Sequence, residues 1–374
     1  MGSFWPKRKL MMKNVSGDVK GAESDVVASV SKGVQRSGSD NPGPVEEGLV
    51  QWAHRDVDKA LEDSRFTQKP VFLLFQEIPG CATCTTFGRV VLSSPRLVEA
   101  IETLFVSCVI NNRGQTESDR QALQRFGEPM LNNPVVRLLE SEGKDLLPRK
   151  GGIYSASELL SRMHEALKKF SSSSSIPTWF SFYCDEVRLS WKRSLKPVSL
   201  ETAVFYMGCF WEGEKALGLL TLPEFGSCPI ISTFSTWRGV YEVVEVEFEQ
   251  TELSFSSLLQ RVKQSLSVRS VGGVIPVTSK QREIAIKILG SNRVVEDRAT
   301  SAETATEQGR TSAERDRKYY LRQFLHQDKT KLGFLSERQQ IMTNALLGRN
   351  SKTGLQWTAV VSPRQLHALG VTQK

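Results

Sequence analysis

The sequence predicts a mixed α/β and α+β fold with two domains, and three observations predict it. A Cys-x-x-Cys motif at residues 81–84 follows an apolar, strand-forming stretch and opens a stretch with helical spacing. A second cysteine, Cys209, stands at another change from strand-forming to helix-forming residues. Five consecutive serines at 171–175 lie between these regions, and such a run cannot pack into a core. A chain of 374 residues is long enough for two domains of about 100 to 200 residues each.

The first region alternates between helix and strand. Helices are predicted at residues 57–64, from 81 onward, at 117–126 and at 157–169. Strands are predicted between them, at residues 70–76, 104–110 and 135–140. The last of these helices is amphipathic. Its apolar face consists of Leu159, Leu160, Met163, Ala166 and Leu167. This alternation is typical of an α/β domain.

The position of the Cys-x-x-Cys motif predicts its chemistry. A cysteine at the start of a helix lies near unpaired N–H groups and the positive end of the helix dipole, both of which favour the thiolate. We therefore expect Cys81 to be the exposed, activated thiol and Cys84, one turn inside the helix, to close a disulfide with it. A zinc site is the alternative, but the chain has no second pair of matching spacing, and its four histidines are scattered. The motif therefore favours redox chemistry over metal binding.

The motif and the order of elements over residues 51–170 resemble the thioredoxin-like family. The lead-in Ile78-Pro79-Gly80 resembles a less common branch of that family. The resemblance implies a thioredoxin-like fold, and it implies that Pro134 is the cis-proline that faces the two cysteines in such proteins. Cys108 lies in an apolar strand pattern, and we expect a buried, inert thiol there.

The second region is organised around the sequence AVFYMGCFWEGEKALG. It predicts a strand, a tight turn at Gly208 and a helix that begins at Cys209, so the same physics favours a thiolate there. Phe210 and Trp211 would form a small apolar pocket beside the thiol, which suits a methyl or thioether group. The alternative is a structural cysteine beside a core aromatic pair.

The segment GCFWEGEKA, with the downstream strand pattern GVYEVVEVEF, resembles the active site of the peptide methionine sulfoxide reductase A family. The resemblance covers residues 202–289 and implies an α/β domain of that kind. It implies that Cys209 attacks the sulfoxide sulfur and that Glu242 protonates the oxygen. Phe210 and Trp211 would hold the methyl group.

Together the two resemblances suggest one oxidoreductase that reduces methionine sulfoxide, free or in oxidised proteins, at Cys209. The product would be a thioether and a sulfenic acid on Cys209, and a further thiol would then reduce the acid. The candidates for that thiol are Cys228, Cys184 and Cys81. A short flexible linker would hold the Cys-x-x-Cys motif at an effective concentration of roughly millimolar. We expect no cofactor and no metal, because the electrons would come from thioredoxin or a similar thiol system. The expected substrate-binding residues are Gly208, Phe210, Trp211 and Pro134.

Two other functions stay open. In the first, the chain is a thioredoxin-like thiol–disulfide or peroxide reductase, and Cys209 accepts electrons without a sulfoxide substrate. In the second, the Cys-x-x-Cys motif acts alone, and a non-catalytic second domain binds methionine-containing or oxidised proteins. Activity that is indifferent to Glu242→Gln would favour the first, and binding without reaction at Cys209 would favour the second.

The predicted division of the chain follows from these patterns. We expect a disordered or targeting tail (1–48), a thioredoxin-like domain (49–170) and a Ser-rich linker (171–199). A peptide methionine sulfoxide reductase A-like domain (200–290), a polar linker (291–317) and a C-terminal helical segment (318–374) follow. Residues 319–348 are apolar at helical spacing. Such a stretch either binds a partner or, in the interpretation we favour, packs back on the second domain.

The charge and hydropathy of the chain limit the classes of partner that we expect. The net charge of +8 comes from basic and acidic residues that are interspersed, so we expect no nucleic-acid partner. No stretch is apolar enough to span a membrane, and the first thirty residues lack the apolar core of a secretory signal. We therefore expect no membrane partner and a cytoplasmic protein, or an organellar one if the N-terminal tail is a transit peptide.

Overall fold

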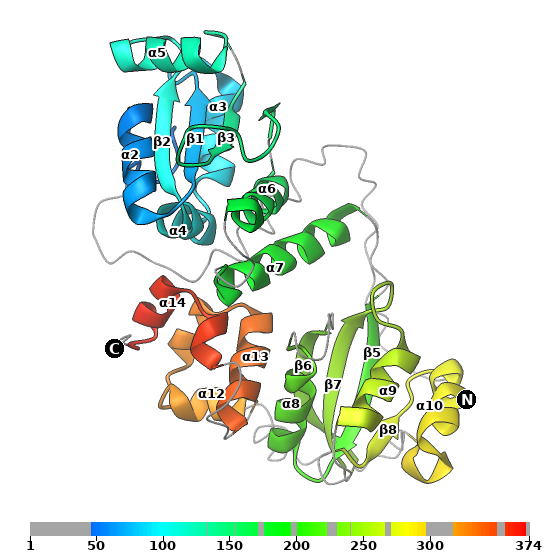
Figure 1. The fold of residues 1–374 in the computed structure, drawn as a ribbon. Helices are drawn as coiled ribbons and strands as arrows, with labels where there is room; N and C mark the ends of the chain where they lie inside the picture. Colours follow the sequence, from blue (N-terminus) through cyan, green and yellow to red (C-terminus); the bar gives the residue numbers. More distant parts are fainter. Residues whose placement is uncertain are drawn as a thin grey trace.

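Two four-stranded sheets, one in each half of the chain, organise the fold (Figure 1). The computed structural model describes residues 46–131, 133–153, 155–170, 176–195, 200–222, 230–239, 241–265, 271–296, 317–349 and 356–371. No helix within these ranges is both long and apolar enough to cross a membrane.

The first sheet has the strand order β2-β1-β3-β4. Its strands are β1 (Val71–Gln76), β2 (Val106–Asn111), β3 (Val135–Leu139) and β4 (Lys150–Gly151). The central strand β1 runs parallel to β2 and antiparallel to β3. All six residues of β1 are buried, which explains why its sequence is a nearly continuous apolar run rather than an alternating one.

Helices cover both faces of this sheet, because alternate residues of β1 face opposite sides. Leu73 and Phe75 lie in one core with α2 (Val57–Thr67) and α5 (Glu117–Phe126). Phe72 and Leu74 lie in the other. That second core also receives side chains from α4 and α6, which span Pro95–Leu104 and Ala156–Phe170.

The predicted order of elements in this region is confirmed, with one addition. The helix that starts at the Cys-x-x-Cys motif is short: α3 (Ala82–Thr86) passes into a π-helical turn at Phe87–Val91. A separate helix, α4, was not predicted; it begins directly after Ser94 with a proline in its first turn, where proline fits a helix well. The expected apolar face of the last helix is buried throughout α6.

The expectation of a linker over residues 171–199 is wrong for most of that stretch. The five serines lie outside the described residues, but Thr178–Leu195 form an 18-residue helix, α7. Trp179, Phe180 and Tyr183 of this helix are buried in the same core as α6. These aromatic side chains give α7 enough apolar surface to dock, which a flexible linker lacks.

The second sheet is antiparallel, with the strand order β6-β7-β5-β8. Along the chain, this half is built from β5 (Leu200–Met207), α8 (Phe210–Leu219), β6 (Ile230–Arg238), β7 (Tyr241–Glu249), α9 (Phe255–Ser265) and β8 (Gly273–Ile275). This is the split β-α-β arrangement of ferredoxin-like folds. Side chains from α8 and α9 share one core with this sheet, and α10 (Ser279–Leu289) adds to it.

The C-terminal segment is helical but broken, whereas one long helical stretch was expected over residues 319–348. It forms α12 (Tyr319–Phe324), α13 (Glu337–Gly348) and α14 (Pro363–Ala368). His326 and Gln327 adopt positive φ angles of 52° and 62°, which ends α12. Of the two interpretations of this segment, packing on the second domain is the one that the structure supports, because α13 packs along α8.

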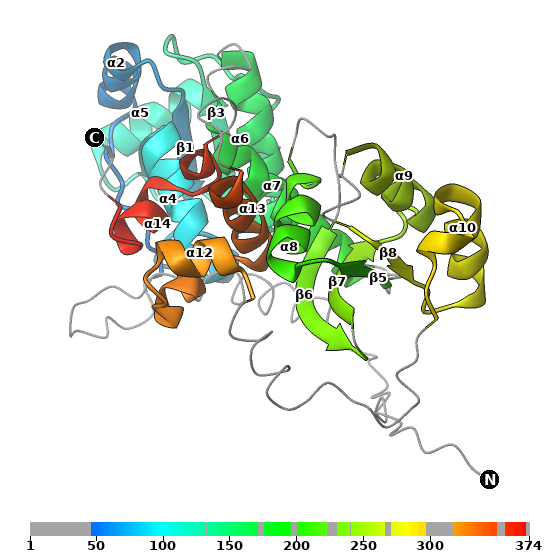
Figure 2. The ribbon, with the colours of Figure 1, turned by 90° about the horizontal axis from the view of Figure 1, so that it is seen from below.

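The same segment also reaches the first domain. Figure 2 shows α13 between α4 and α8. Buried polar contacts hold it on the α4 side: Arg96 donates to the Gln339 side chain at 2.7 Å, and the Ser362 hydroxyl donates to Glu99 at 2.7 Å. Arg96 also pairs with Glu186 of α7 at 2.6 Å. The C-terminal helices therefore connect the two halves of the chain through specific buried groups.

Candidate functional site

The Cys-x-x-Cys motif lies at the end of β1, where the chain turns into α3. Cys81 is the N-cap residue of α3, and its sulfur accepts a hydrogen bond from the backbone N–H of Cys84 at 3.2 Å. Cys81 is partly exposed, whereas Cys84 is completely buried. The predicted division into an outer and an inner thiol is therefore present in the geometry.

The two thiols have opposite acidities. Burial raises the pKa of Cys81, but hydrogen bonds from Cys84 and Thr83 outweigh it, so the pKa falls below the ordinary cysteine value. Burial raises the pKa of Cys84 to about 12, and its hydrogen bond to Cys81 acts in the same direction. Of the two thiols, Cys81 is therefore the one that ionises more readily, and Cys84 keeps its proton near neutral pH.

Alkylation with iodoacetamide should separate the two thiols. A pKa of about 12 leaves Cys84 with about 1000-fold less thiolate than an ordinary cysteine at neutral pH. We expect Cys81 to be modified, with a rate that levels off at a lower pH than for an ordinary cysteine because its pKa is lowered, and Cys84 to stay unmodified at neutral pH. Peptide mass spectrometry at a series of pH values measures both rates. Equal rates at Cys81 and Cys84 would contradict the assignment of roles.

The loop before β3 lies against the motif, but not through a cis-proline. Among the described residues the cis peptide bond joins Ile78 and Pro79, so the expected cis bond before Pro134 is wrong. The two isomers of an X–Pro bond differ by only about 0.5 to 1 kcal/mol, too little for the local sequence to decide between them. The contact to the motif comes instead from Asn133, whose side-chain oxygen accepts from the Thr83 hydroxyl at 2.8 Å.

A family model described as thioredoxin-like matches residues 52–141. These residues form a thioredoxin-like domain. A solved structure titled "DsbH Oxidoreductase" is 22% identical, with a TM-score of 0.28, and the match covers 36% of this chain and 95% of that chain. No curated protein matches the sequence. The family match ends before residue 200 and so does not support the resemblance of the second domain to peptide methionine sulfoxide reductase A.

Cys209 and Glu242 lie close together in the second domain. Cys209 is the N-cap of α8 and is partly exposed, as predicted, directly after the exposed Gly208. Met207 of β5 is paired with Glu242 of β7, which brings the carboxylate to the start of α8. One oxygen of Glu242 accepts a hydrogen bond from the Phe210 backbone N–H at 2.7 Å. The carboxylate thus occupies the N-terminus of the helix, next to the thiol.

The aromatic residues after Cys209 do not form the expected open pocket. Phe210 is only 5% exposed and belongs to the core beneath the sheet. The Trp211 ring stacks on Tyr319 of α12, with ring centroids 3.9 Å apart and planes 6° from parallel. One face of the indole is therefore covered by a residue of the C-terminal segment.

The C-terminal segment brings a further residue, Tyr320, to this site. The Tyr320 hydroxyl donates to the Glu212 carboxylate, and the Lys215 ammonium does the same. Desolvation raises the pKa of Tyr320, and the hydrogen bond to the Glu212 carboxylate raises it further. No local sequence pattern predicts this contact, because Tyr320 and Glu212 are 108 residues apart.

The remaining cysteines differ from one another. Cys108 is completely buried in β2, and burial raises its pKa to about 12, as expected for an inert thiol. Cys184 lies on α7 against the core of the thioredoxin-like domain, and burial raises its pKa to about 12 as well. Cys228, the other candidate partner of Cys209, lies outside the described residues.

Cys81 and Cys209 lie in separate parts of the molecule. In Figure 1, α4, α6 and α7 lie between α3, which starts at Cys81, and α8, which starts at Cys209. The expected direct exchange between Cys81 and Cys209 thus has no support in this arrangement. The helix α7 is part of the reason, because it occupies the stretch expected to be a flexible linker.

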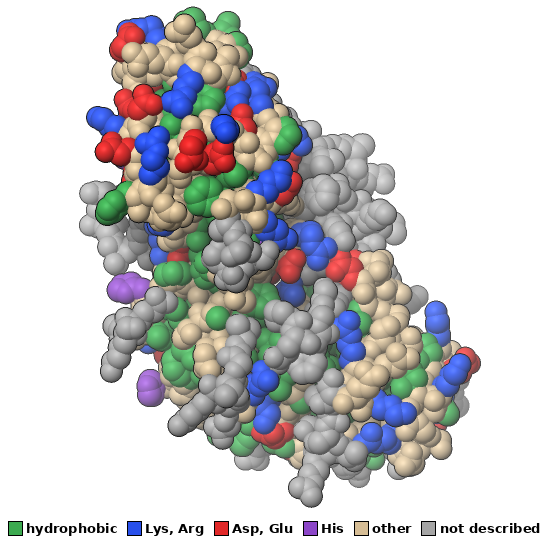
Figure 3. All heavy atoms as spheres, in the orientation of Figure 1, with side chains coloured by type: hydrophobic (Ala, Val, Ile, Leu, Met, Phe, Trp, Pro, Cys, Tyr) green, Lys and Arg blue, Asp and Glu red, His purple; other side chains and the backbone are tan. Residues whose placement is uncertain are grey.

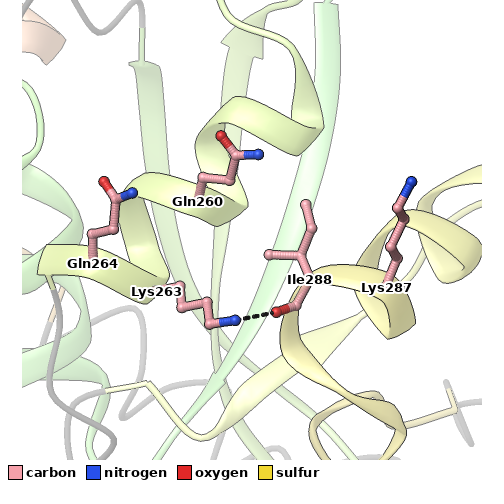
Figure 4. Close-up of a pocket in the computed structure, with 5 residues that line it drawn as sticks. All are labelled: Gln260, Lys263, Gln264, Lys287 and Ile288. Carbon is pink, nitrogen blue, oxygen red and sulfur yellow. Dashed lines mark hydrogen bonds between the residues drawn. The ribbon is translucent and has the colours of Figure 1, made fainter.

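A groove between α9 and α10 is distinct from both cysteine sites. Its volume is about 630 Å³, and it is lined by Gln260, Lys263, Gln264, Lys287 and Ile288 (Figure 4). Lys263 donates to the Ile288 backbone oxygen at 2.8 Å across it. No cluster of three potential metal ligands occurs in the part of the chain that the structure describes.

Proposed function

We propose that the thioredoxin-like domain catalyses thiol–disulfide exchange with disulfides of peptides or proteins. The observation that carries this proposal is the asymmetry of the Cys-x-x-Cys pair. Cys81 is partly exposed with a lowered pKa, while Cys84 is buried with a pKa of about 12. An accessible thiolate beside a protected thiol suits attack followed by intramolecular resolution.

The reaction would proceed in two balanced exchanges. The Cys81 thiolate attacks one sulfur of the target disulfide; a Cys81–target disulfide forms, and the other target sulfur leaves as a thiolate that takes up a proton. Cys84 then loses its proton and attacks the Cys81 sulfur, which releases the second target sulfur. Two electrons pass to the target, and a Cys81–Cys84 disulfide remains. A thioredoxin-like or other thiol system would restore the reduced pair without an organic cofactor or a metal.

The loop beside the motif supports a peptide or protein as the target. Met130 and Leu131 are 60% and 76% exposed and belong to the same loop as Asn133, which contacts Thr83 of α3. Apolar side chains beside a reactive thiol would bind the chain that flanks a disulfide. In Figure 3 basic and acidic side chains are intermixed over the upper part of the molecule, so the face in view offers no patch of one charge.

Mass spectrometry of one turnover tests the proposal. The reduced protein is mixed with an excess of a peptide disulfide, quenched with acid and digested. We expect the Cys81–Cys84 disulfide to form with one equivalent of reduced peptide. Absence of that disulfide, with the peptide left oxidised, would refute the proposal.

Reduction of methionine sulfoxide at Cys209 is a second candidate, favoured by the position of Glu242 at the start of α8. The Cys209 thiolate would attack the sulfoxide sulfur, Glu242 would deliver a proton to the oxygen, and a thioether would leave with a sulfenic acid on Cys209. A thiol would then reduce that acid with release of water. Because α3 and α8 are apart, an external thiol rather than Cys81 would act in this arrangement.

A methyl sulfoxide peptide without added reductant tests this candidate. Stoichiometric formation of the thioether, lost in Cys209→Ser and retained in Cys81→Ser, would support it. If no thioether forms while the protein still reduces a peptide disulfide, the second domain is non-catalytic.

A further inference from the structure

A chain of three side chains runs from the reactive sulfur to the loop before β3. The Cys81 sulfur and the Thr83 hydroxyl are 2.9 Å apart, and that hydroxyl donates to the Asn133 side-chain oxygen at 2.8 Å. Asn133 and Thr83 are 50 residues apart in the sequence, so the contact depends on the fold. Nothing in the proposed exchange reaction yet uses Asn133.

The Thr83 hydroxyl has a single proton, and that proton cannot serve both neighbours. While Asn133 accepts it, the Cys81 thiol can donate its own proton to the Thr83 oxygen. Once Cys81 ionises, its sulfur can only accept, so the Thr83 proton must turn from Asn133 to the sulfur. The Thr83 oxygen then lacks a donor unless Asn133 supplies one.

We propose that Asn133 is a positioning residue for the exchange reaction, whose side-chain amide accepts from Thr83 in the thiol state and donates to Thr83 in the thiolate state. Its oxygen and nitrogen occupy nearly equivalent positions after a half-turn of the amide, so the same contact serves both states. Asn133 thus stabilises the nucleophile through Thr83 rather than by a hydrogen bond of its own to the sulfur. This inference rests on the proposed role of Cys81.

Other ionisable groups near Cys81 stay unchanged in the test. Cys84 faces it from α3, and Glu77 and Arg113 form an ion pair of 3.2 Å beside Gly80, just before the cysteine. None of these groups contacts Asn133 in the described hydrogen bonds. The uncharged substitution Asn133→Ala therefore changes the Thr83 contact and leaves the charged surroundings of Cys81 intact.

The test measures the pH dependence of iodoacetamide alkylation at Cys81 in the full chain. Loss of one hydrogen bond to a thiolate should raise its pKa by about one unit in Thr83→Val, and by about half a unit in Asn133→Ala. The double variant Thr83→Val/Asn133→Ala should match Thr83→Val, because Asn133 acts only through the hydroxyl. Thr83→Ser, which keeps the hydroxyl, should titrate like the original protein.

Asn133→Asp sharpens the test, because a carboxylate can only accept. It would hold the Thr83 proton away from the sulfur and would add a negative charge near the thiolate, and both effects should raise the Cys81 pKa by more than Asn133→Ala does. An unchanged Cys81 pKa in Asn133→Ala, or additive shifts in the double variant, would overturn the proposal. Alkylation needs no disulfide target, so this result is independent of whether the exchange reaction itself occurs.

Discussion

Replacement of Cys84 by serine is expected to trap the protein in a mixed disulfide with its target, whereas replacement of Cys81 should abolish exchange. In the proposed reaction the buried thiol of Cys84 resolves the intermediate, so Cys84→Ser leaves the Cys81–target bond without an intramolecular attacker. Cys81→Ser removes the nucleophile, and we expect a loss of rate on the order of 1000-fold or more. Intact-mass spectrometry after addition of a peptide disulfide measures both outcomes, as a mass gain of one peptide in the first variant and none in the second.

Two other cysteine variants are the matched controls. Cys108→Ala changes a completely buried thiol with a pKa of about 12, and Cys209→Ser changes the thiol of the other domain. Both should exchange with the peptide disulfide at the original rate. If Cys209→Ser abolishes exchange, or Cys81→Ser retains it, the activity does not belong to the thioredoxin-like domain.

The thioredoxin-like half could be predicted largely from its sequence, because its signals are local. The buried run of β1, the motif that follows it and the amphipathic face of α6 each lie within one short stretch. The helix α5 has the predicted bounds, 117–126, and a Thr116 capping box marks its start. The helix α4 was missed because the motif helix was extended through residues that form a π-helical turn.

The surroundings of Cys209 could be predicted only in part, because half of them come from elsewhere in the chain. The strand–turn–helix around Cys209 and the approach of Glu242 follow from local pattern and strand pairing. The stacking of Tyr319 on Trp211 and the contact of Tyr320 with Glu212 are long-range contacts. A helical pattern in the C-terminal segment shows that it has an apolar face, but not which side chains meet the reactive cysteine.

Lys318→Met is expected to be the most destabilising single change in the second domain. Lys318 and Glu214 form an ion pair of 3.0 Å in which both side chains are at most 3% exposed. The ammonium also donates to the Thr233 hydroxyl and backbone oxygen, at 2.7 and 2.9 Å. Removal of one partner leaves the Glu214 charge buried and uncompensated, which costs about 3 to 5 kcal/mol.

Hydrogen exchange measured by mass spectrometry is the suitable readout, because unfolding of a chain with two domains need not be two-state. In Lys318→Met, peptides from α8 and α12 should lose protection, while peptides from β1 and α5 should not. Glu117→Gln is the control, since the Glu117–Arg120 pair is 2.8 Å long but exposed, and exposed pairs contribute little to stability.

The double variant Glu214→Leu/Lys318→Met separates charge burial from packing. It removes both charges at once, so it should recover much of the protection that Lys318→Met loses. Lys318 directly precedes Tyr319, so the single variant should also release the ring that stacks on Trp211 and make Cys209 more accessible to iodoacetamide. If Lys318→Met leaves both α8 protection and Cys209 alkylation unchanged, the buried pair does not hold the C-terminal segment on the second cysteine site.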